Sequence, residues 1–177
     1  MRRTFLLAPL AMCLGLLMTP AFAAVPQVGQ SAPEFRLQDQ NGHWRTPGDY
    51  HGRYLVVYFY PKDFTGGCTT EVCSFRDDIA KLRQGGADVI GISLDDVKSH
   101  EKFAEKYHVP FPLLADSDHK VTEAYGVLNE HLGIHYAKRT TFLIDPQGKI
   151  VEVYEDVDPE KNSAQVLADL VRLKALQ

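Results

Sequence analysis

The sequence predicts an α/β domain with a mixed, mostly parallel central sheet that is covered by helices on both faces. Two continuous runs of aromatic and β-branched residues, at 54–60 and 87–94, are typical of strands buried on both faces. Helical segments follow each of these runs, and this alternation favours a sheet between two helical layers. A length of 177 residues suits one domain together with a short processing segment.

The first half of the domain contains an N-terminal hairpin and two strand–helix units. Residues 35–44 are expected to form the hairpin, because Asn41-Gly42 favours a type I′ turn. The strand over 54–60 ends at Pro61, and a helix is expected from about 68 to 83, where Gly85-Gly86 stops it. After the strand over 87–94, a helix over 97–107 has one apolar face, formed by Val97, Phe103, Ala104 and Tyr107.

The second half is expected to end in an antiparallel pair of strands and a helix. A short strand at 112–115 and a short helix near 120–125 come first. Strands at 140–144 and 149–154 are joined by a tight turn at 145–148. The last helix begins near Asp158-Pro159 and runs to about Leu176. Its inward side chains are expected to be Val166, Leu167, Leu170, Val171 and Leu173.

Residues 1–23 differ from the rest of the chain. Arg2 and Arg3 precede an apolar run, which closes with Ala21-Phe22-Ala23. This arrangement is that of a signal peptide cleaved after Ala23, which leaves a domain over 24–177. The apolar run is short for a membrane span of ~20 residues, which disfavours a retained anchor. We therefore expect export, in a bacterium to the periplasm, without stable membrane association, by either the general or the twin-arginine route.

Composition and charge exclude several classes of protein. The chain is 45% hydrophobic and 24% charged, as expected of a globular protein rather than a disordered or fibrous one. Its formal net charge is −4, and acidic and basic residues are interspersed. Because no basic patch with interleaved aromatic residues is present in the sequence, nucleic acid is not an expected partner.

The two cysteines of the expected domain are Cys68 and Cys73, since Cys13 lies in the leader. In an oxidising compartment two cysteines commonly form a structural disulfide. On one helix, however, this spacing gives about 7.5 Å of rise, and a disulfide needs Cα atoms within about 4.4–6.8 Å. Either the helix unwinds locally or the bridge does not form. The spacing suits a bond that is made and broken during turnover, with a structural disulfide as the alternative.

Cys68 is expected at the start of a helix, directly after a buried strand and a glycine-containing loop. The unpaired N–H groups and the positive dipole end of a helix N-terminus favour a thiolate over a thiol. A thiolate is the nucleophilic form of cysteine. Gly66 and Gly67 allow the backbone to approach whatever Cys68 attacks. Thr65 can place a hydroxyl beside the sulfur.

These residues resemble the active-site signature of peroxiredoxins, Pro-x-x-x-Thr-x-x-Cys, at Pro61, Thr65 and Cys68. The longer segment 58–77, with its second cysteine five residues later, is similar to the Q-type subfamily, also called bacterioferritin-comigratory-protein-like. The resemblance extends from about residue 25 to residue 173. It implies a thioredoxin-like fold with an N-terminal β-hairpin extension. It also implies a thiol peroxidase that reduces hydrogen peroxide and small organic hydroperoxides.

The resemblance implies a chemical role for each cysteine and for one arginine. Cys68 would attack the peroxide and become a sulfenic acid. Cys73 would resolve that acid by forming an intramolecular disulfide, which a thioredoxin-like dithiol donor would reduce. Arg139, in the segment 138–145, would hold the thiolate and the negative charge that develops on oxygen.

Further residues are implied in substrate binding. Thr65 would contact the sulfur and the peroxide, Pro61 would shield the pocket, and Gly67 would line it. Gly66 departs from the pattern, because the subfamily usually has proline there. No metal, haem or flavin is implied, and the subfamily pattern favours a monomer.

Several alternatives are less favoured by the pattern. A general thiol–disulfide oxidoreductase would carry Cys-x-x-Cys, and a copper module would carry Cys-x-x-x-Cys, neither of which is present in the sequence. An inert domain with a structural disulfide is the remaining alternative. His131 and His135 have metal-ligand spacing but are expected in a solvated loop. Glu71 could act as a base, but it is expected to be a solvated helical side chain. Trp44 is expected to pack within the hairpin rather than to recognise a partner.

Overall fold

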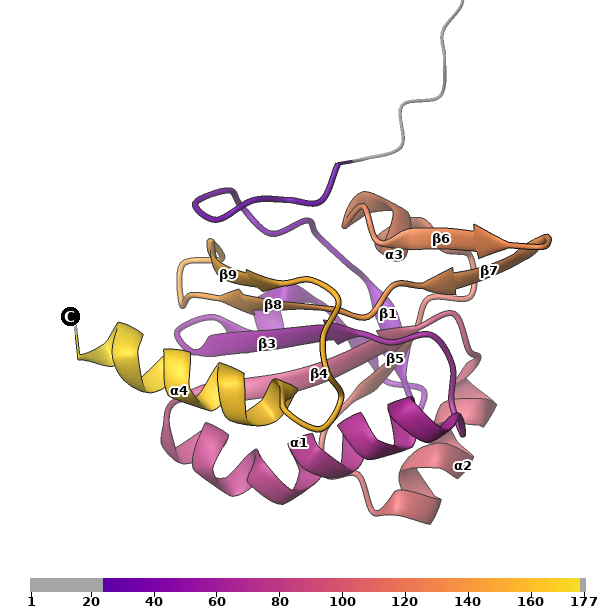
Figure 1. The fold of residues 1–177 in the computed structure, drawn as a ribbon, viewed down its shortest axis with the longest axis horizontal. Helices are drawn as coiled ribbons and strands as arrows, with labels where there is room; N and C mark the ends of the chain where they lie inside the picture. The colour runs from indigo at the N-terminus through magenta and orange to yellow at the C-terminus, as the bar shows by residue number, and fades with distance from the viewer. Residues whose placement is uncertain (1–23, 176–177) are drawn as a thin grey trace, which may run out of the picture.

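The computed structural model describes residues 24–175, so the expected leader at 1–23 lies outside the described residues. Its centre is a seven-stranded mixed sheet in the order β2-β1-β5-β4-β3-β8-β9 (Figure 1). These strands are β1 (Leu37–Asp39), β2 (Trp44–Arg45), β3 (Tyr54–Phe59), β4 (Ala87–Ser93), β5 (Leu113–Ala115), β8 (Thr140–Ile144) and β9 (Ile150–Tyr154). The α/β class and the mixed sheet flanked by helices are therefore confirmed, but the expectation of a mostly parallel sheet is wrong, because four of the six strand pairings in this sheet are antiparallel.

The middle of the sheet is formed by β3, which is buried along its whole length. It pairs in parallel with β4 and antiparallel with β8, and β4 pairs in parallel with β5. A strand that has neighbours on both edges and helices on both faces has no solvated side, which explains its unbroken apolar sequence. Among the described residues no helix is long and apolar enough to cross a membrane.

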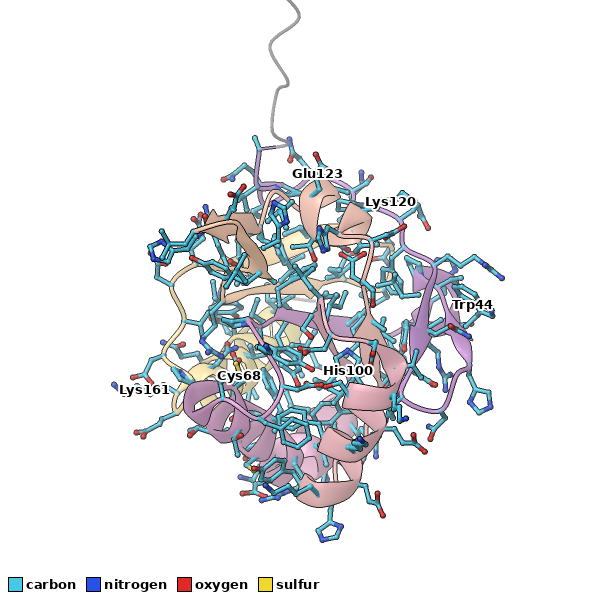
Figure 2. The ribbon with its side chains drawn as sticks, turned by 90° about the vertical axis from the view of Figure 1, so that its right-hand side faces the viewer. Trp44, Cys68, His100, Lys120, Glu123 and Lys161 are labelled. Carbon is cyan, nitrogen blue, oxygen red and sulfur yellow. The ribbon has the colours of Figure 1, made fainter. Side chains whose placement is uncertain are left out.

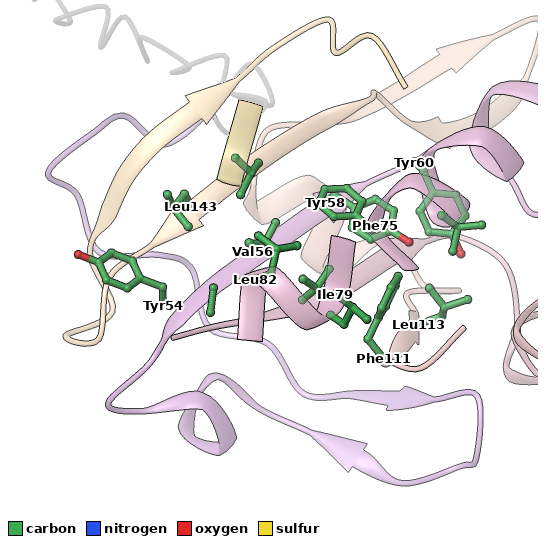
Figure 3. Close-up of a cluster of buried hydrophobic side chains, with 14 of the residues drawn as sticks. Tyr54, Val56, Tyr58, Tyr60, Phe75, Ile79, Leu82, Phe111, Leu113 and Leu143 are labelled. Carbon is green, nitrogen blue, oxygen red and sulfur yellow. The ribbon is translucent and has the colours of Figure 1, made fainter. Parts of the chain in front are cut away.

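Helices α1 (Gly66–Gln84), α2 (Val97–Tyr107) and α4 (Asn162–Lys174) cover one face of the sheet, while the short α3 (Lys120–Ala124) lies on the other (Figure 1). Alternate residues of β3 point to the two faces, as the period of a strand requires. Val56 and Tyr58 contribute to the core under α1, shown in Figure 3, whereas Val57 and Phe59 contribute to the core on the opposite face.

The N-terminal hairpin is present, but the expected type I′ turn is wrong. Leu37 pairs with Arg45 and Gln38 with Trp44, so the connection is longer than two residues. Of the turn residues Asn41 and Gly42, only Gly42 has a positive φ, at 76°, whereas a type I′ turn needs two such residues. The buried carboxylate of Asp39 instead accepts the backbone N–H of Asn41 at 2.9 Å and holds the longer loop.

A second hairpin, β6 (Leu128–His131) and β7 (Ile134–Ala137), was not predicted. It forms a separate two-stranded sheet where a solvated loop was expected at His131 and His135. Its turn is Leu132-Gly133, in which both residues have positive φ, as in a type I′ turn. The sequence does not indicate this turn, because Leu132 occupies its first position, where asparagine, aspartate or glycine is usual.

The last helix begins later than expected. A turn that includes a hydrogen bond from the Lys161 N–H to the Asp158 carbonyl precedes it, and α4 starts at Asn162. Val166 and Leu170 are buried as expected, but Val171 is 64% exposed, so its expected inward orientation is wrong. The later start places Asn162, rather than Pro159, at the first turn of the helix.

Candidate active site

The loop over 61–65 connects the carboxyl end of β3 to the N-terminus of α1. It is anchored by Asp63, a buried carboxylate that accepts hydrogen bonds from the hydroxyls of Tyr60 (2.8 Å) and Ser99 (2.7 Å). The Nδ1 atom of the buried His100 lies 2.9 Å from the same carboxylate. These contacts tie the loop to the first turn of α2, and Figure 2 shows His100 on that helix and Cys68 at the beginning of α1.

Cys68 is the third residue of α1 and is only 1% exposed. Its sulfur accepts a hydrogen bond from Nη2 of Arg139 at 3.3 Å. Arg139 lies directly before β8, which is antiparallel to β3, and this pairing brings it to the end of β3 where α1 begins. A guanidinium and a helix N-terminus both favour the charged form of the thiol. The expected approach of Arg139 to Cys68 is thus present in the structure.

Glu71 is a component of the site that the sequence analysis did not assign. It lies one turn after Cys68 on α1 and is fully buried, so the expectation of a solvated side chain is wrong. Its Oε2 atom forms an ion pair with Nη1 of Arg139. Its Oε1 atom accepts a hydrogen bond from Asn162 at 3.1 Å. The i,i+3 spacing from Cys68 was the available signal, because it puts both side chains on one helix face.

Burial raises the pKa of Glu71 to about 7, against the opposing effects of Arg139 and of the Asn162 amide. The pKa of Arg139 is raised despite its burial, chiefly because the carboxylate of Glu71 and the sulfur of Cys68 favour its charged form. The Arg139 guanidinium therefore contacts two acidic groups, the carboxyl of Glu71 and the thiol of Cys68. The charge of Glu71 affects how strongly Arg139 interacts with the sulfur.

The residues expected to bind substrate lie in the loop before α1 and in the first turn of this helix. Thr65 is the N-cap of α1, and its hydroxyl donates to the carbonyl of Lys62 at 2.9 Å. Pro61 is half-buried at the start of the loop. A Cβ atom added to Gly67 would lie 3.2 Å from Nη2 of Arg139, so glycine allows the arginine its close approach. The contact of the Thr65 hydroxyl with a peroxide stays a prediction.

Cys73 lies on the same continuous helix as Cys68, and both cysteines are free. Cys73 is partly buried and packs against the core under α1. Because five residues of an intact helix span about 7.5 Å along its axis, the disulfide cannot close without unwinding part of α1.

The other candidates lie apart from this cluster. Trp44 is 51% exposed and packs within the hairpin as expected, because the guanidinium of Arg36 is stacked 3.9 Å above its ring. His135 lies 3.4 Å from Glu130 across the second hairpin. In the described part of the chain, no group of three or more His, Cys, Asp or Glu side chains is placed to hold a metal ion.

Comparison with known proteins identifies the family. The model of the AhpC/TSA family matches residues 28–153. The peroxiredoxin Bcp of Bacillus subtilis is 41% identical over 148 residues, which cover 81% of this chain and 94% of the relative. Chloroplastic peroxiredoxin Q of rice (subspecies japonica) is 40% identical over 169 residues, covering 88% of this chain and 77% of the relative.

Solved structures agree with these relatives. A mutant of PrxQ from Xylella fastidiosa superposes with a TM-score of 0.81 at 33% identity, covering 86% of this chain and 99% of that one. A structure that addresses the alkyl peroxide reduction activity of the Xanthomonas campestris bacterioferritin comigratory protein has a TM-score of 0.74 at 35% identity, covering 78% and 90%. The chain therefore belongs to the AhpC/TSA family and is a thiol peroxidase similar to peroxiredoxins Q and Bcp.

Proposed function

We propose that this enzyme reduces hydroperoxides through a sulfenic acid at Cys68. The thiolate attacks the terminal peroxide oxygen, so that an S–O bond forms while the O–O bond breaks, and the other oxygen leaves as an alcohol or water after protonation. The observation that carries the proposal is the 3.3 Å hydrogen bond from Arg139 to the buried sulfur of Cys68. This guanidinium can stabilise the thiolate before attack and the negative charge on oxygen during it.

The second step closes the disulfide. The sulfur of Cys73 attacks the sulfenic sulfur, an S–S bond replaces the S–O bond, and water leaves. A dithiol donor of the thioredoxin class then reduces the disulfide and becomes oxidised itself. Both cysteines are free in the structure and lie on one helix, which suits a disulfide that exists only in the oxidised enzyme.

The proposed substrates are hydrogen peroxide and small organic hydroperoxides. The Xanthomonas relative is described in terms of alkyl peroxide reduction, which supports activity on organic substrates. We also propose that the enzyme acts as an exported, periplasmic monomer, and the support for export is the leader-like sequence of residues 1–23.

The proposal is tested by adding one equivalent of hydrogen peroxide to the reduced protein and following peroxide loss over seconds. Peptide mass spectrometry reports the state of Cys68 and Cys73 separately. We expect the loss of one peroxide and of both thiols in the wild type. Cys68→Ser should abolish the reaction, whereas Cys73→Ser should consume one peroxide and then stall at the sulfenic acid. Undiminished turnover in Cys68→Ser would refute the role of this residue.

A second measurement tests the unwinding of α1. Oxidation should increase amide hydrogen exchange across residues 68–76, because the disulfide cannot form on an intact helix. The Cys73→Ser variant, oxidised in the same way, is the control that should retain protection. Equal protection in the reduced and the disulfide-bonded wild type would exclude this mechanism of closure.

A further inference from the structure

Asn162 contacts the active site through Glu71. It is the first residue of α4 and is fully buried. Its Nδ2 atom donates to Oε1 of Glu71 at 3.1 Å and to the hydroxyl of Thr141 on β8 at 2.6 Å. The Asn162 amide therefore joins α4, α1 and the central sheet at one point.

The contacts form a chain that ends at the reacting sulfur. The two oxygens of the Glu71 carboxylate are divided, with Oε2 on Arg139 and Oε1 on Asn162. The guanidinium of Arg139 is divided in the same way, with Nη1 on Glu71 and Nη2 on the sulfur. A planar carboxylate held at both oxygens has little rotational freedom, and it fixes the plane of the guanidinium that it binds. The plane in which the Arg139 guanidinium is held thus depends on the amide.

We propose that Asn162 is a positioning residue for peroxide reduction, which orients Arg139 through Glu71 and determines how the charge of Arg139 is shared between Glu71 and Cys68. The inference rests on the role of Cys68 proposed above. Asn162 has no role assigned by the sequence signature, and it reaches the site only because α4 starts four residues after Asp158.

The Asn162 amide favours the charged form of Glu71. A hydrogen bond to a carboxylate favours its charged form, so the Asn162 amide opposes the effect of burial on Glu71. The negative charge of ionised Glu71 partly offsets the positive charge of Arg139 at the sulfur. When Glu71 is neutral, Arg139 attracts the thiolate more strongly. The fully buried Tyr58 hydroxyl on β3 also interacts with Glu71, and its pKa is raised well above the usual value, chiefly by burial and next by the charge of Glu71.

Asn162→Leu removes the amide at similar volume and tests the proposal. Ser163→Ala is the matched control, because Ser163 is also buried on α4 and its hydroxyl donates to Asp78 on α1 at 2.8 Å, away from the ion pair. Two quantities are measured in each protein between pH 4.5 and 9. One is the rate of alkylation of Cys68 by iodoacetamide, followed on its own peptide, and the other is the rate constant for its oxidation by hydrogen peroxide.

The two measurements should move in opposite directions in Asn162→Leu. Neutral Glu71 leaves more of the charge of Arg139 to the sulfur, so the rate of Cys68 alkylation at pH 7 should rise about threefold. Peroxide oxidation at pH 7 should nevertheless slow about tenfold, because Arg139 is no longer held in the productive orientation. Ser163→Ala should leave both measurements at the wild-type values.

Thr141→Val provides a second route to the same result if Asn162→Leu does not fold. Valine has the same shape as threonine but lacks the hydroxyl that the Asn162 amide contacts. Thr141→Val should therefore shift both measurements in the same directions as Asn162→Leu, but by a smaller amount. An alkylation rate that is unchanged in both variants, or that falls together with the rate of peroxide oxidation, would overturn the proposal. Since alkylation needs no peroxide, failure of the wild type to consume peroxide would instead overturn the proposed role of Cys68.

Discussion

Replacing Glu71 by glutamine should change how the stability of the enzyme depends on pH. Glutamine has nearly the same shape as glutamate but does not titrate. The wild-type carboxyl is fully buried, and burial raises its pKa from 4.5 to about 7 in the folded enzyme. Any fixed cost of Glu71→Gln, such as the loss of charge opposite Arg139, applies at every pH and cancels when the two proteins are compared across pH.

The sign of the effect comes from proton binding. Between pH 4.5 and 7 the folded state retains the proton of Glu71 and the unfolded state has released it, so unfolding releases a proton and stability falls as the pH rises. The contribution is fully present below the unfolded pKa and is lost above the folded pKa. Each pH unit in this range corresponds to ~1.4 kcal/mol, so wild type should lose up to ~3 kcal/mol relative to Glu71→Gln.

Urea unfolding of both reduced proteins at pH 4.5, 5.5, 6.5 and 7.5 measures this difference. The free energy of unfolding of the wild type should decline with pH more steeply than that of Glu71→Gln. The two curves should diverge between pH 4.5 and about 7, the unfolded and folded pKa values of Glu71. All other titrating groups are shared by the two proteins. Stability curves that run parallel within ~0.5 kcal/mol would refute the burial of a titrating carboxyl at this position.

Three glycines give further predictions. Gly66→Pro should raise the free energy of unfolding by ~0.4–1 kcal/mol in urea titration, because a Cβ there meets no atom within 4 Å and proline suits the first turn of a helix. Gly67→Ala should slow peroxide oxidation by about 10- to 100-fold in stopped-flow measurements, because its Cβ would lie 3.2 Å from Arg139. Gly91→Ala should cost ~1–3 kcal/mol, seen as a lower melting temperature, because its Cβ would lie 2.6 Å from the ring of Tyr58.

The elements that were predicted well are those whose sequence pattern has one physical explanation. The run over 54–60 has no polar position, and only a strand with both faces covered accommodates it, as β3 does. The position of Cys68 at a helix start followed from the strand, the loop and the glycines around it. Local sequence signals therefore predicted the position of the Cys68 sulfur. The antiparallel pairing of β3 with β8 brings Arg139 beside it.

The parts that were missed depend on contacts between distant segments. Glu71 has the sequence context of a solvated helical residue, and it is buried because Arg139 and Asn162 approach it from 68 and 91 residues away. The second hairpin was missed because Leu132 occupies a left-handed position that its side chain does not favour. The i,i+3 spacing places Glu71 on the helix face of Cys68 but does not indicate its burial, and the turn residues of the second hairpin give no local signal of a turn.

The ion pair of Arg139 and Glu71 beside Cys68 opposes the second step of the proposed cycle. Unwinding the first turns of α1 to bring Cys73 to the sulfur separates Glu71 from Arg139 and from Asn162. Removing one partner of a buried charged pair is unfavourable, so the closed arrangement holds the helix until the sulfenic acid has formed. Once Glu71 leaves its buried site, its pKa should return from about 7 towards 4.5, and it should release a proton at neutral pH. The titration of this carboxyl thus favours the closed site at low pH and favours its opening increasingly as the pH rises from 4.5 to about 7.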